Sequence, residues 1–418
     1  MDLSTAQNIL VIGGGQAAAQ AIASLRLWGF EGGIRLIADE PALPYQRPPL
    51  SKAYLKGEMD EERLYFKPAE WYEAQNVRVS LNTRATAIDR SARSIALSDG
   101  TRADYDALIL ATGSRPRPLP IEGADLKGVH ELRDLRDVDG LKPVVTKGQN
   151  MVIVGAGYIG LEAAAVAHQL GANVTVLEMA PRVLARVTSP VMSAFYTELH
   201  ENNGVKIKTE ARLTRLSGED GMVTSAHLAD GSALPADLVL VGIGILPNQE
   251  LAGEAGIACA SERGGGIIVD EDARTNDPRI FAAGDCTVRP LVHYGRTGRL
   301  ESVHNAIEQG KLAAAAILGR ERPRLDVPWF WSDQYEVKLQ IAGLSQNYDH
   351  HIVRGDPESG SFAVFYFREN RLIAVDAVNA APEFIVTKKL IISGQTLAPD
   401  ELQDTSVSMK DLAARAAV

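Results

Sequence analysis

The stretch that decides the fold is Asn8-Ile-Leu-Val-Ile-Gly-Gly-Gly-Gln-Ala-Ala18. Residues 8–12 predict a buried parallel strand, and the three glycines after it open a helix of small and apolar residues. A second predicted strand, residues 34–38, ends at Asp39. The order of strand, glycine turn, helix, strand and acid indicates a βαβ unit that binds a dinucleotide.

The same plan recurs farther along the chain. Residues 151–154 predict a strand, Gly155-Ala-Gly-Tyr-Ile-Gly160 opens a helix that runs through Leu170, and the strand at residues 173–177 ends at Glu178. In both copies the acid follows about 20–25 residues after the turn, as this motif requires. Glycine-rich turns that bind no nucleotide are the alternative. The repeat predicts an α/β fold with two Rossmann-like domains.

Each part of the turn has a physical task. The first glycine, Gly13 or Gly155, permits the tight bend after the strand. The second, Gly15 or Gly157, lets the backbone approach a pyrophosphate, which the free N–H groups and the dipole of the helix stabilise. Two such sites on one chain predict two different dinucleotides, a flavin that stays bound and a nicotinamide that exchanges. Glu178 would repel the extra phosphate of NADPH, so we expect a preference for NADH.

Three further apolar segments complete the two nucleotide-binding units. Residues 105–110 predict a strand that is followed by Ala-Thr-Gly113, and residues 238–243 predict one that is followed by Gly244. The segment Ile280-Phe-Ala-Ala-Gly-Asp285 has the same character. Asp285 is a candidate acceptor for a ribityl hydroxyl, and the alternative is an acid that caps a helix.

Composition narrows the class of protein. The 418 residues carry a net charge of −10, which argues against a general nucleic-acid binder. The chain has two cysteines, Cys259 and Cys286, far apart in sequence, which argues against a disulfide framework, a paired redox thiol or a cysteine-bound metal. We expect no metal site. The first residues lack a signal sequence and no run approaches the length of a membrane span, so we expect a cytoplasmic protein.

These motifs resemble the two-dinucleotide flavoprotein superfamily of glutathione reductase. Within it, three segments are similar to the oxygenase-coupled ferredoxin reductases, the group of putidaredoxin reductase. They are Pro44-Tyr-Gln-Arg-Pro-Pro-Leu-Ser-Lys52, Gly155-Ala-Gly-Tyr-Ile-Gly-Leu-Glu162 and Pro328-Trp-Phe-Trp-Ser-Asp-Gln-Tyr335. The resemblance runs nearly end to end, with Ala18 where many relatives have glycine.

The resemblance implies a discontinuous architecture. An FAD domain would comprise residues 1–117 and 250–327, with an NADH domain at 118–249 inserted in it. A C-terminal α+β domain would cover residues 328–418, with strands at 337–343, 351–354, 362–367 and 371–378 and a helix near 382–392.

The resemblance also implies the residues of the site. Those assigned to FAD are Gly13, Gly15, Ala17, Asp39, Arg47, Lys52, Ala85, Arg133, Asp285 and Val303. Those assigned to NADH are Gly155, Gly157, Ile159, Gly160, Glu178 and Gly244. The residues implied to act at the reactive edge of the flavin are Lys52, Glu162, Tyr158 and Trp331.

Three of the four catalytic assignments have a plainer alternative. The resemblance implies that Lys52 lies by the flavin and pairs with Glu162, while the alternative for Glu162 is a solvated helix residue. Tyr158 would stack on the flavin face and swing aside for the nicotinamide, or else pack in a core. Trp331 would be an aromatic lid on the flavin, or else a core residue.

The implied function is an NADH-dependent reductase that passes electrons through FAD to a [2Fe-2S] ferredoxin serving an oxygenase, such as a cytochrome mono-oxygenase. Ferredoxins are acidic, so a basic docking patch is expected. The candidates are Lys67, Lys311, Lys338 and Lys410, and scattered surface lysines are the alternative.

Two other functions compete. An NADH oxidase, or a reductase of quinone, peroxide or disulfide, belongs to the same superfamily. The disulfide and peroxide readings need a reactive cysteine near the flavin in the first domain, and residues 1–258 contain none. A flavin-bearing signalling protein without enzymatic activity is the second alternative.

Overall fold

The computed structural model describes every residue except 1–2, 4, 263 and 417–418. The chain divides into two compact units. The first unit comprises Met1–Arg47, Glu61–Arg115 and Ile245–Asp326, and the second comprises Pro48–Asp60, Pro116–Gly244 and Val327–Val418. The four-part division into nucleotide and C-terminal domains that the sequence suggests stays a prediction.

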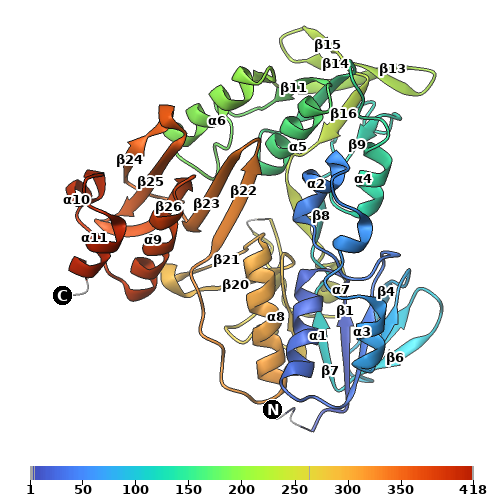
Figure 1. Ribbon diagram of the computed structural model, residues 1–418. Coiled ribbons are helices and arrows are strands. Elements are labelled where there is room, and N and C mark those ends of the chain that lie inside the picture. Colours follow the sequence, from blue (N-terminus) through green and yellow to red (C-terminus); the bar gives the residue numbers. More distant parts are fainter. Residues whose placement is uncertain (1–2, 4, 263, 417–418) are drawn as a thin grey trace. The chain divides into compact units, whose positions relative to one another are not determined.

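The first unit is built on a parallel sheet with strand order β19-β7-β1-β2-β3. Its central strands β7 and β1 and the neighbouring β19 are almost wholly buried and apolar, as expected where helices cover both faces. The bounds of the strands are β1 Asn8–Ile12, β2 Gly33–Ile37, β3 Val77–Ser80, β7 Ala107–Leu110 and β19 Ile280–Ala282. Helices α1 (Gln16–Leu27) and α8 (Val303–Ile317) run side by side in Figure 1. They approach closely because position 310 is glycine, where a Cβ would lie 2.8 Å from the Ala17 carbonyl oxygen.

Smaller elements complete the first unit. Two three-stranded sheets have the orders β4-β5-β6 and β18-β20-β21. Their strands are β4 Ala85–Asp89, β5 Ser94–Leu97, β6 Arg102–Asp104, β18 Ile267–Ile268, β20 Thr287–Leu291 and β21 Arg296–Gly298. The short helices are η2 Glu61–Arg63, α3 Ala69–Ala74, α7 Glu250–Glu254 and η3 Val292–Tyr294. Two short strands, β8 Ser114–Pro116 and β17 Ile245–Pro247, lie where the chain passes from one unit to the other.

The second unit contains another parallel sheet, with strand order β12-β11-β10-β16-β9. Its strands are β9 Val129–His130, β10 Asn150–Val154, β11 Asn173–Leu177, β12 Lys206–Lys208 and β16 Leu238–Val241. An antiparallel sheet of β13 Leu213–Glu219, β14 Met222–Leu228 and β15 Ala233–Pro235 accompanies it. The helices are η1 Pro48–Ser51, α2 Ala53–Lys56, α4 Leu135–Leu141, α5 Tyr158–Gln169 and α6 Pro190–Asn202.

The C-terminal residues of the second unit form a five-stranded antiparallel sheet, ordered β22-β23-β26-β25-β24. The strands are β22 Trp329–Gln334, β23 Val337–Gly343, β24 His350–Asp356, β25 Ser361–Arg368 and β26 Arg371–Val378, with η4 at Pro357–Ser359. Helices α9 (Ala381–Ser393), α10 (Pro399–Gln403) and α11 (Met409–Ala416) follow. The buried Arg354 guanidinium donates to the carbonyl oxygens of Leu402, Asp404 and Val407 and so ties this end of the chain to the sheet.

The sequence located the main elements, with errors at their ends. The strand expected at residues 105–110 begins later, at Ala107, and the one expected at 238–243 ends at Val241. Strand β22 and helices α10 and α11 were not expected at all. Four of the six residues of β22 are partly exposed on strand faces, so its hydrophobic pattern is irregular. In the part of the chain that the structure describes, no helix is long and apolar enough to cross a membrane.

Candidate functional site

The first glycine turn leaves the N-terminus of helix α1 uncovered by side chains of the described residues. Gly13 has a φ of +112°, and a Cβ there would lie 2.1 Å from the Ala111 carbonyl oxygen, so only glycine fits. At Gly15, the N-cap of α1, a Cβ would meet no described atom within 4 Å. No side chain among the described residues caps this helix. Its first N–H groups are therefore available to an anion.

The second turn repeats this geometry. At Gly155, where φ is +107°, a Cβ would lie 2.4 Å from the Gly242 carbonyl oxygen, and at Gly160 it would lie 2.2 Å from the Gly155 carbonyl oxygen. Above Gly157 no described atom lies within 4 Å, and helix α5 likewise has no side-chain cap among the described residues. Gly244, in the loop after β16, also has open space at its Cβ position within the described chain. Both turns can admit a pyrophosphate.

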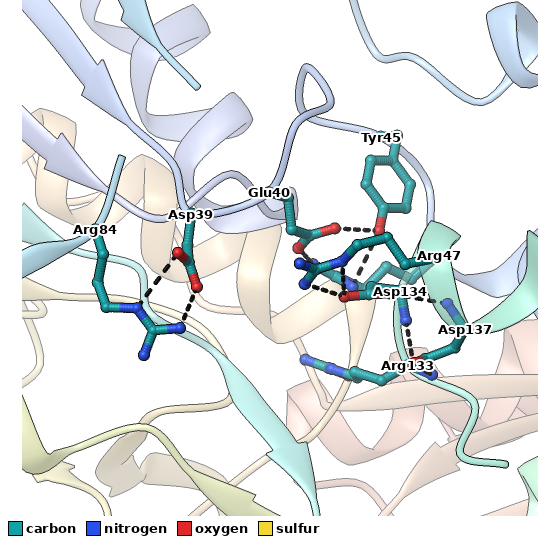
Figure 2. Close-up of polar contacts among 9 residues, drawn as sticks. Asp39, Glu40, Tyr45, Arg47, Arg84, Arg133, Asp134 and Asp137 are labelled. Atoms are coloured by element: carbon teal, nitrogen blue, oxygen red, sulfur yellow. Dashed lines mark hydrogen bonds and ion pairs between the residues drawn. The ribbon is translucent and has the colours of Figure 1, made fainter. Parts of the chain in front are cut away.

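The acids that follow the two turns differ in their surroundings. The Glu178 carboxylate accepts hydrogen bonds from the backbone N–H of Ala156, at 2.9 Å, and of Ala180, at 2.8 Å. It is thereby fixed against the second glycine turn. Asp39 is half exposed and forms an ion pair with Arg84, with 2.6 Å between Oδ2 and Nη2 (Figure 2).

The residue after Asp39 holds part of the loop that the resemblance singled out. Glu40 pairs with Arg47, and its other oxygen accepts a hydrogen bond from the Tyr45 hydroxyl at 2.5 Å (Figure 2). Arg47 also lies over the Tyr45 ring, 5.1 Å from its centre. The sequence did not single out Glu40, although its position beside Asp39 could have drawn attention to it.

Asp285 lies in a turn between β19 and β20 and does not cap a helix. Its carboxylate accepts a hydrogen bond from Ser114 Oγ at 2.9 Å. Helix α8 is instead capped by Ser302, so the helix-cap alternative for Asp285 is wrong. The turn is held by Gln309, whose Oε1 accepts hydrogen bonds from the Gly284 N–H at 2.9 Å and from Thr287 Oγ1 at 2.8 Å.

A buried ion pair joins Lys52 and Glu162 in the second unit. Lys52 Nζ lies 2.6 Å from Glu162 Oε2, and Ser51 Oγ donates to the same oxygen at 2.7 Å. Lys52 also donates to the Pro48 carbonyl oxygen at 3.3 Å. The Glu162 side chain is 5% exposed, so it is not the solvated helix residue of the alternative reading. The pair presents one cation, 20% exposed, at the start of α2.

The sequence missed a set of polar residues behind this pair. Ser332 Oγ donates to Glu162 Oε1 at 2.7 Å, and Gln334 Nε2 donates to Ser332 Oγ at 3.1 Å. Gln334 Oε1 in turn lies 2.8 Å from His200 Nε2. In the segment around Ser332 the sequence analysis had given a role to Trp331 alone.

Tyr158 opens helix α5 with its ring half-buried and its hydroxyl fully buried. Burial and then the charge of Asp376 raise its pKa well above the usual value for tyrosine. Among the described residues, neither this hydroxyl, nor that of Tyr196, nor Asp376 Oδ1 has a hydrogen-bond partner. Asp376 Oδ2 accepts hydrogen bonds from Thr188 and from Tyr366. A buried carboxyl therefore lies close to the second glycine turn.

Trp331 lies half-buried on β22, and its ring is tilted by 35° against that of Trp329, 5.5 Å away. Arg133 precedes α4, and its backbone N–H donates to the Asp137 carboxylate at 2.8 Å (Figure 2). The other expected residues occupy element ends and turns. Ala85 begins β4, Val303 begins α8, Ile159 is exposed in the first turn of α5, and Ala17 lies buried in that of α1.

Neither cysteine has the surroundings of a reactive thiol. Cys286 is fully buried, and Cys259 is partly buried. Burial raises the pKa of both thiols, which disfavours the reactive thiolate.

The four lysines proposed as a basic patch are all exposed: Lys67, Lys311, Lys338 and Lys410. Lys67 and Lys311 belong to the first unit, and Lys338 and Lys410 to the second.

Two parallel sheets, each with an open glycine turn and a following acid, define a protein that binds two dinucleotides. Comparison with known sequences makes the class specific. The pattern of the pyridine nucleotide-disulphide oxidoreductase family matches residues 7–310, and that of the reductase C-terminal domain matches residues 329–413. The chain belongs to the pyridine nucleotide-disulphide oxidoreductase family.

Individual relatives match along nearly their whole length. Putidaredoxin reductase of Pseudomonas putida is 42% identical over 98% of this chain and 97% of its own. Rhodocoxin reductase of Rhodococcus erythropolis is 41% identical over 98% of this chain and 95% of its own. The reductase in the crystal structure of the covalent putidaredoxin reductase–putidaredoxin complex superposes with a TM-score of 0.96, covering 99% of both chains at 42% identity.

Proposed function

We propose that this protein is an FAD-dependent reductase that takes electrons from NADH and delivers them one at a time to a [2Fe-2S] ferredoxin serving an oxygenase. The observation that carries the proposal is the combination of two open glycine turns with the lack of a dithiol. The chain's two cysteines are free, and Cys286 is fully buried. No thiol pair can therefore accept electrons from the flavin, so the electrons pass from the flavin to an external acceptor.

The residues present fit both dinucleotides. The open space above Gly15 and Gly157, at the ends of two twelve-residue helices, suits two pyrophosphates. When bound, FAD supplies the conversion between the two-electron chemistry of NADH and single-electron transfer. Glu178 is fixed by two backbone N–H groups and keeps lone pairs for ribose hydroxyls. The same negative charge opposes the additional phosphate of NADPH.

Lys52 is the residue proposed to act at the reactive edge of the flavin. A cation there stabilises negative charge on the ring. The pairing with Glu162 keeps the ammonium group in one place, at 2.6 Å from the carboxylate. Tyr158 and Trp331 supply the aromatic surfaces of the site, and the Tyr158 hydroxyl is buried.

The proposed distribution of roles along the chain is the one that the resemblance to the ferredoxin reductases implies. FAD is assigned to residues 1–117 and 250–327, NADH to residues 118–249, and coverage of the flavin with partner docking to residues 328–418. The contacts with FAD are assigned to Gly13, Gly15, Ala17, Asp39, Arg47, Lys52, Ala85, Arg133, Asp285 and Val303. Those with NADH are assigned to Gly155, Gly157, Ile159, Gly160, Glu178 and Gly244.

The assignment of a ferredoxin as partner is supported by relatives that are named as reductases of putidaredoxin and rhodocoxin. It is also supported by the solved complex of a reductase with putidaredoxin. The four exposed lysines are proposed as the basic surface that attracts the ferredoxin. The net charge of the chain is −10, so the attraction is local and depends on where these lysines lie. A cytoplasmic location of the protein stays a prediction.

Anaerobic rapid mixing tests the proposal. NADH should bleach the flavin absorbance within seconds, and a [2Fe-2S] ferredoxin should then restore it. A flavin that NADH leaves oxidised, or a reduced flavin that returns its electrons only to O₂ or a quinone, contradicts the proposal.

A further inference from the structure

The carboxylate of Glu162 is held from both sides. Oε2 receives hydrogen bonds from Lys52 and Ser51, and Oε1 receives one from Ser332 at 2.7 Å. Ser332 lies on β22, and its side chain is 1% exposed. Ser332 lies 170 residues after Glu162 in the chain, so a distant segment fixes the orientation of this carboxylate.

The hydrogen bonds behind Ser332 all run in one direction. Because Ser332 gives its hydrogen to Glu162, its oxygen accepts from Gln334 Nε2, at 3.1 Å. That leaves Gln334 Oε1 to accept from His200 Nε2–H, at 2.8 Å. His200 is fully buried, and burial lowers its pKa, which favours the neutral ring; with the hydrogen on Nε2, its Nδ1 is an acceptor. The Tyr335 hydroxyl lies 3.4 Å from that Nδ1.

Strand geometry connects this chain of hydrogen bonds with the aromatic side of the site. Successive side chains of a strand point to opposite faces, so Ser332 and Trp331 face opposite sides of β22. A shift of β22 therefore displaces Trp331 and the hydrogen bond to Glu162 together. Because β22 pairs along its length with β23, its position is set by the C-terminal sheet.

We propose that Ser332 is a positioning residue for the reaction: supported by Gln334 and His200, it orients Glu162 so that Lys52 is held at the flavin edge. The link to the flavin rests on the proposed function. Loss of the Ser332 hydroxyl leaves Glu162 Oε1 without this donor in a buried site, where an unpaired acceptor is unfavourable. The carboxylate then turns or draws in another donor, and the ammonium group of Lys52 loses its fixed position.

The test compares S332A and S332T in the flavin-loaded protein. Two properties are measured: the flavin midpoint potential, and the rate at which an amine-reactive reagent modifies Lys52, read by mass spectrometry. In S332A we expect a more negative potential, because a cation is less well fixed beside the reduced flavin. We also expect modification of Lys52 to rise at least threefold relative to Lys56, an internal reference that is paired with Glu58. S332T, which keeps the hydroxyl, should restore both values.

Two further variants make the result specific. S94A removes another buried serine hydroxyl, on β5, and should change neither property. Q334M leaves Ser332 in place but removes its hydrogen-bond support, and should shift both properties in the same direction by less; it also serves if S332A does not fold. If S332A and Q334M both leave the potential and the labelling of Lys52 unchanged, the positioning role is wrong.

The outcome separates this proposal from the proposed function. Suppose that the wild-type protein fails to reduce ferredoxin, while S332A still raises the modification rate of Lys52 and lowers the flavin midpoint potential. The proposed electron acceptor is then wrong, and the positioning role of Ser332 stands. If the wild-type protein reduces ferredoxin and S332A behaves like wild type, the positioning role alone is overturned.

Discussion

Replacing Asp376 by asparagine should stabilise the protein at neutral and alkaline pH and have little effect in acid. Asp376 lies on β26 and is fully buried, and no described residue pairs with its Oδ1. Burial raises the pKa of this carboxyl to about 6, although hydrogen bonds from Thr188 and Tyr366 oppose the shift. The ionised form is therefore unfavourable in the folded protein.

The size of the effect follows from the two pKa values. The shift runs from an ordinary value of 3.8 to about 6, and each pKa unit corresponds to about 1.4 kcal/mol, so ionisation in the folded state costs up to about 3 kcal/mol. Because the folded pKa is the higher one, the folded state binds the proton more tightly. The free energy of unfolding thus falls as pH rises from about 4 to about 6, and it stays lowered above that.

Asparagine removes the charge and keeps an acceptor for Thr188 and Tyr366. Its amide N–H₂ would replace Oδ1, near enough to Tyr158 and Tyr196 that, besides burial, the charge of Asp376 raises the pKa of both; their hydroxyl oxygens have no hydrogen-bond partner among the described residues. We expect the variant to exceed wild type in the free energy of unfolding by up to about 3 kcal/mol near pH 8 and to match it near pH 4.

Urea unfolding followed by tryptophan fluorescence, with both proteins saturated with FAD, measures the difference at several pH values. Thr188→Val is a useful companion, since it removes one donor to the same carboxylate and should destabilise the ionised form further. A difference between wild type and D376N that does not change with pH would refute the reasoning.

Three other predictions concern cofactor choice, thiols and docking. Glu178→Ala should narrow the preference for NADH over NADPH, because Glu178 repels the additional phosphate of NADPH. Two like unit charges at about 4 Å repel each other by roughly 4 kcal/mol at an effective dielectric of 20, and even about 1.4–3 kcal/mol corresponds to a coenzyme preference of roughly 10- to 100-fold. Steady-state assays with both coenzymes measure this preference, and equal use of both by the wild type contradicts the prediction. The double variant Cys259→Ala with Cys286→Ala should keep most of the ferredoxin-reducing activity, because neither thiol has the surroundings of a reactive group. A loss of activity greater than about tenfold, with the flavin retained, would favour a reductase of disulfide or peroxide instead. Charge reversal at Lys338 or Lys311 should slow ferredoxin reduction and leave NADH–ferricyanide activity intact, because a small dye needs no docking surface; an equal loss with both acceptors would show that the lysines act elsewhere.

The two parallel sheets could be predicted because their signals are local. Each strand, glycine turn and acid lies within one short stretch, and the second copy repeats the first. The contacts that demand glycine at Gly13 and Gly155 are long-range, because their partners are the carbonyl oxygens of Ala111 and Gly242, but the motif itself marks both glycine positions. Motif spacing therefore located the nucleotide turns before any tertiary contact was known.

The polar interior of the second unit could not be predicted in the same way. The bond between Ser332 and Glu162 joins residues 170 positions apart, and that between Thr188 and Asp376 joins residues 188 positions apart. Serine, threonine and aspartate occur on surfaces and in turns far more often than in cores, so composition gave no sign that these side chains are buried. The Lys52–Glu162 pair was anticipated only through the resemblance to known reductases.

The central claim is the path of electrons from NADH to ferredoxin. Its most direct measurement is anaerobic stopped-flow spectroscopy in which the protein, reduced by NADH, is mixed with a [2Fe-2S] ferredoxin from the same organism, while flavin and iron–sulfur absorbance are followed together. We predict two single-electron steps per NADH, reoxidation of the flavin in step with reduction of the ferredoxin, and a rate that falls as salt screens the attraction between the partners. Ferredoxins that stay oxidised while O₂ or a quinone reoxidises the flavin rapidly would contradict the account.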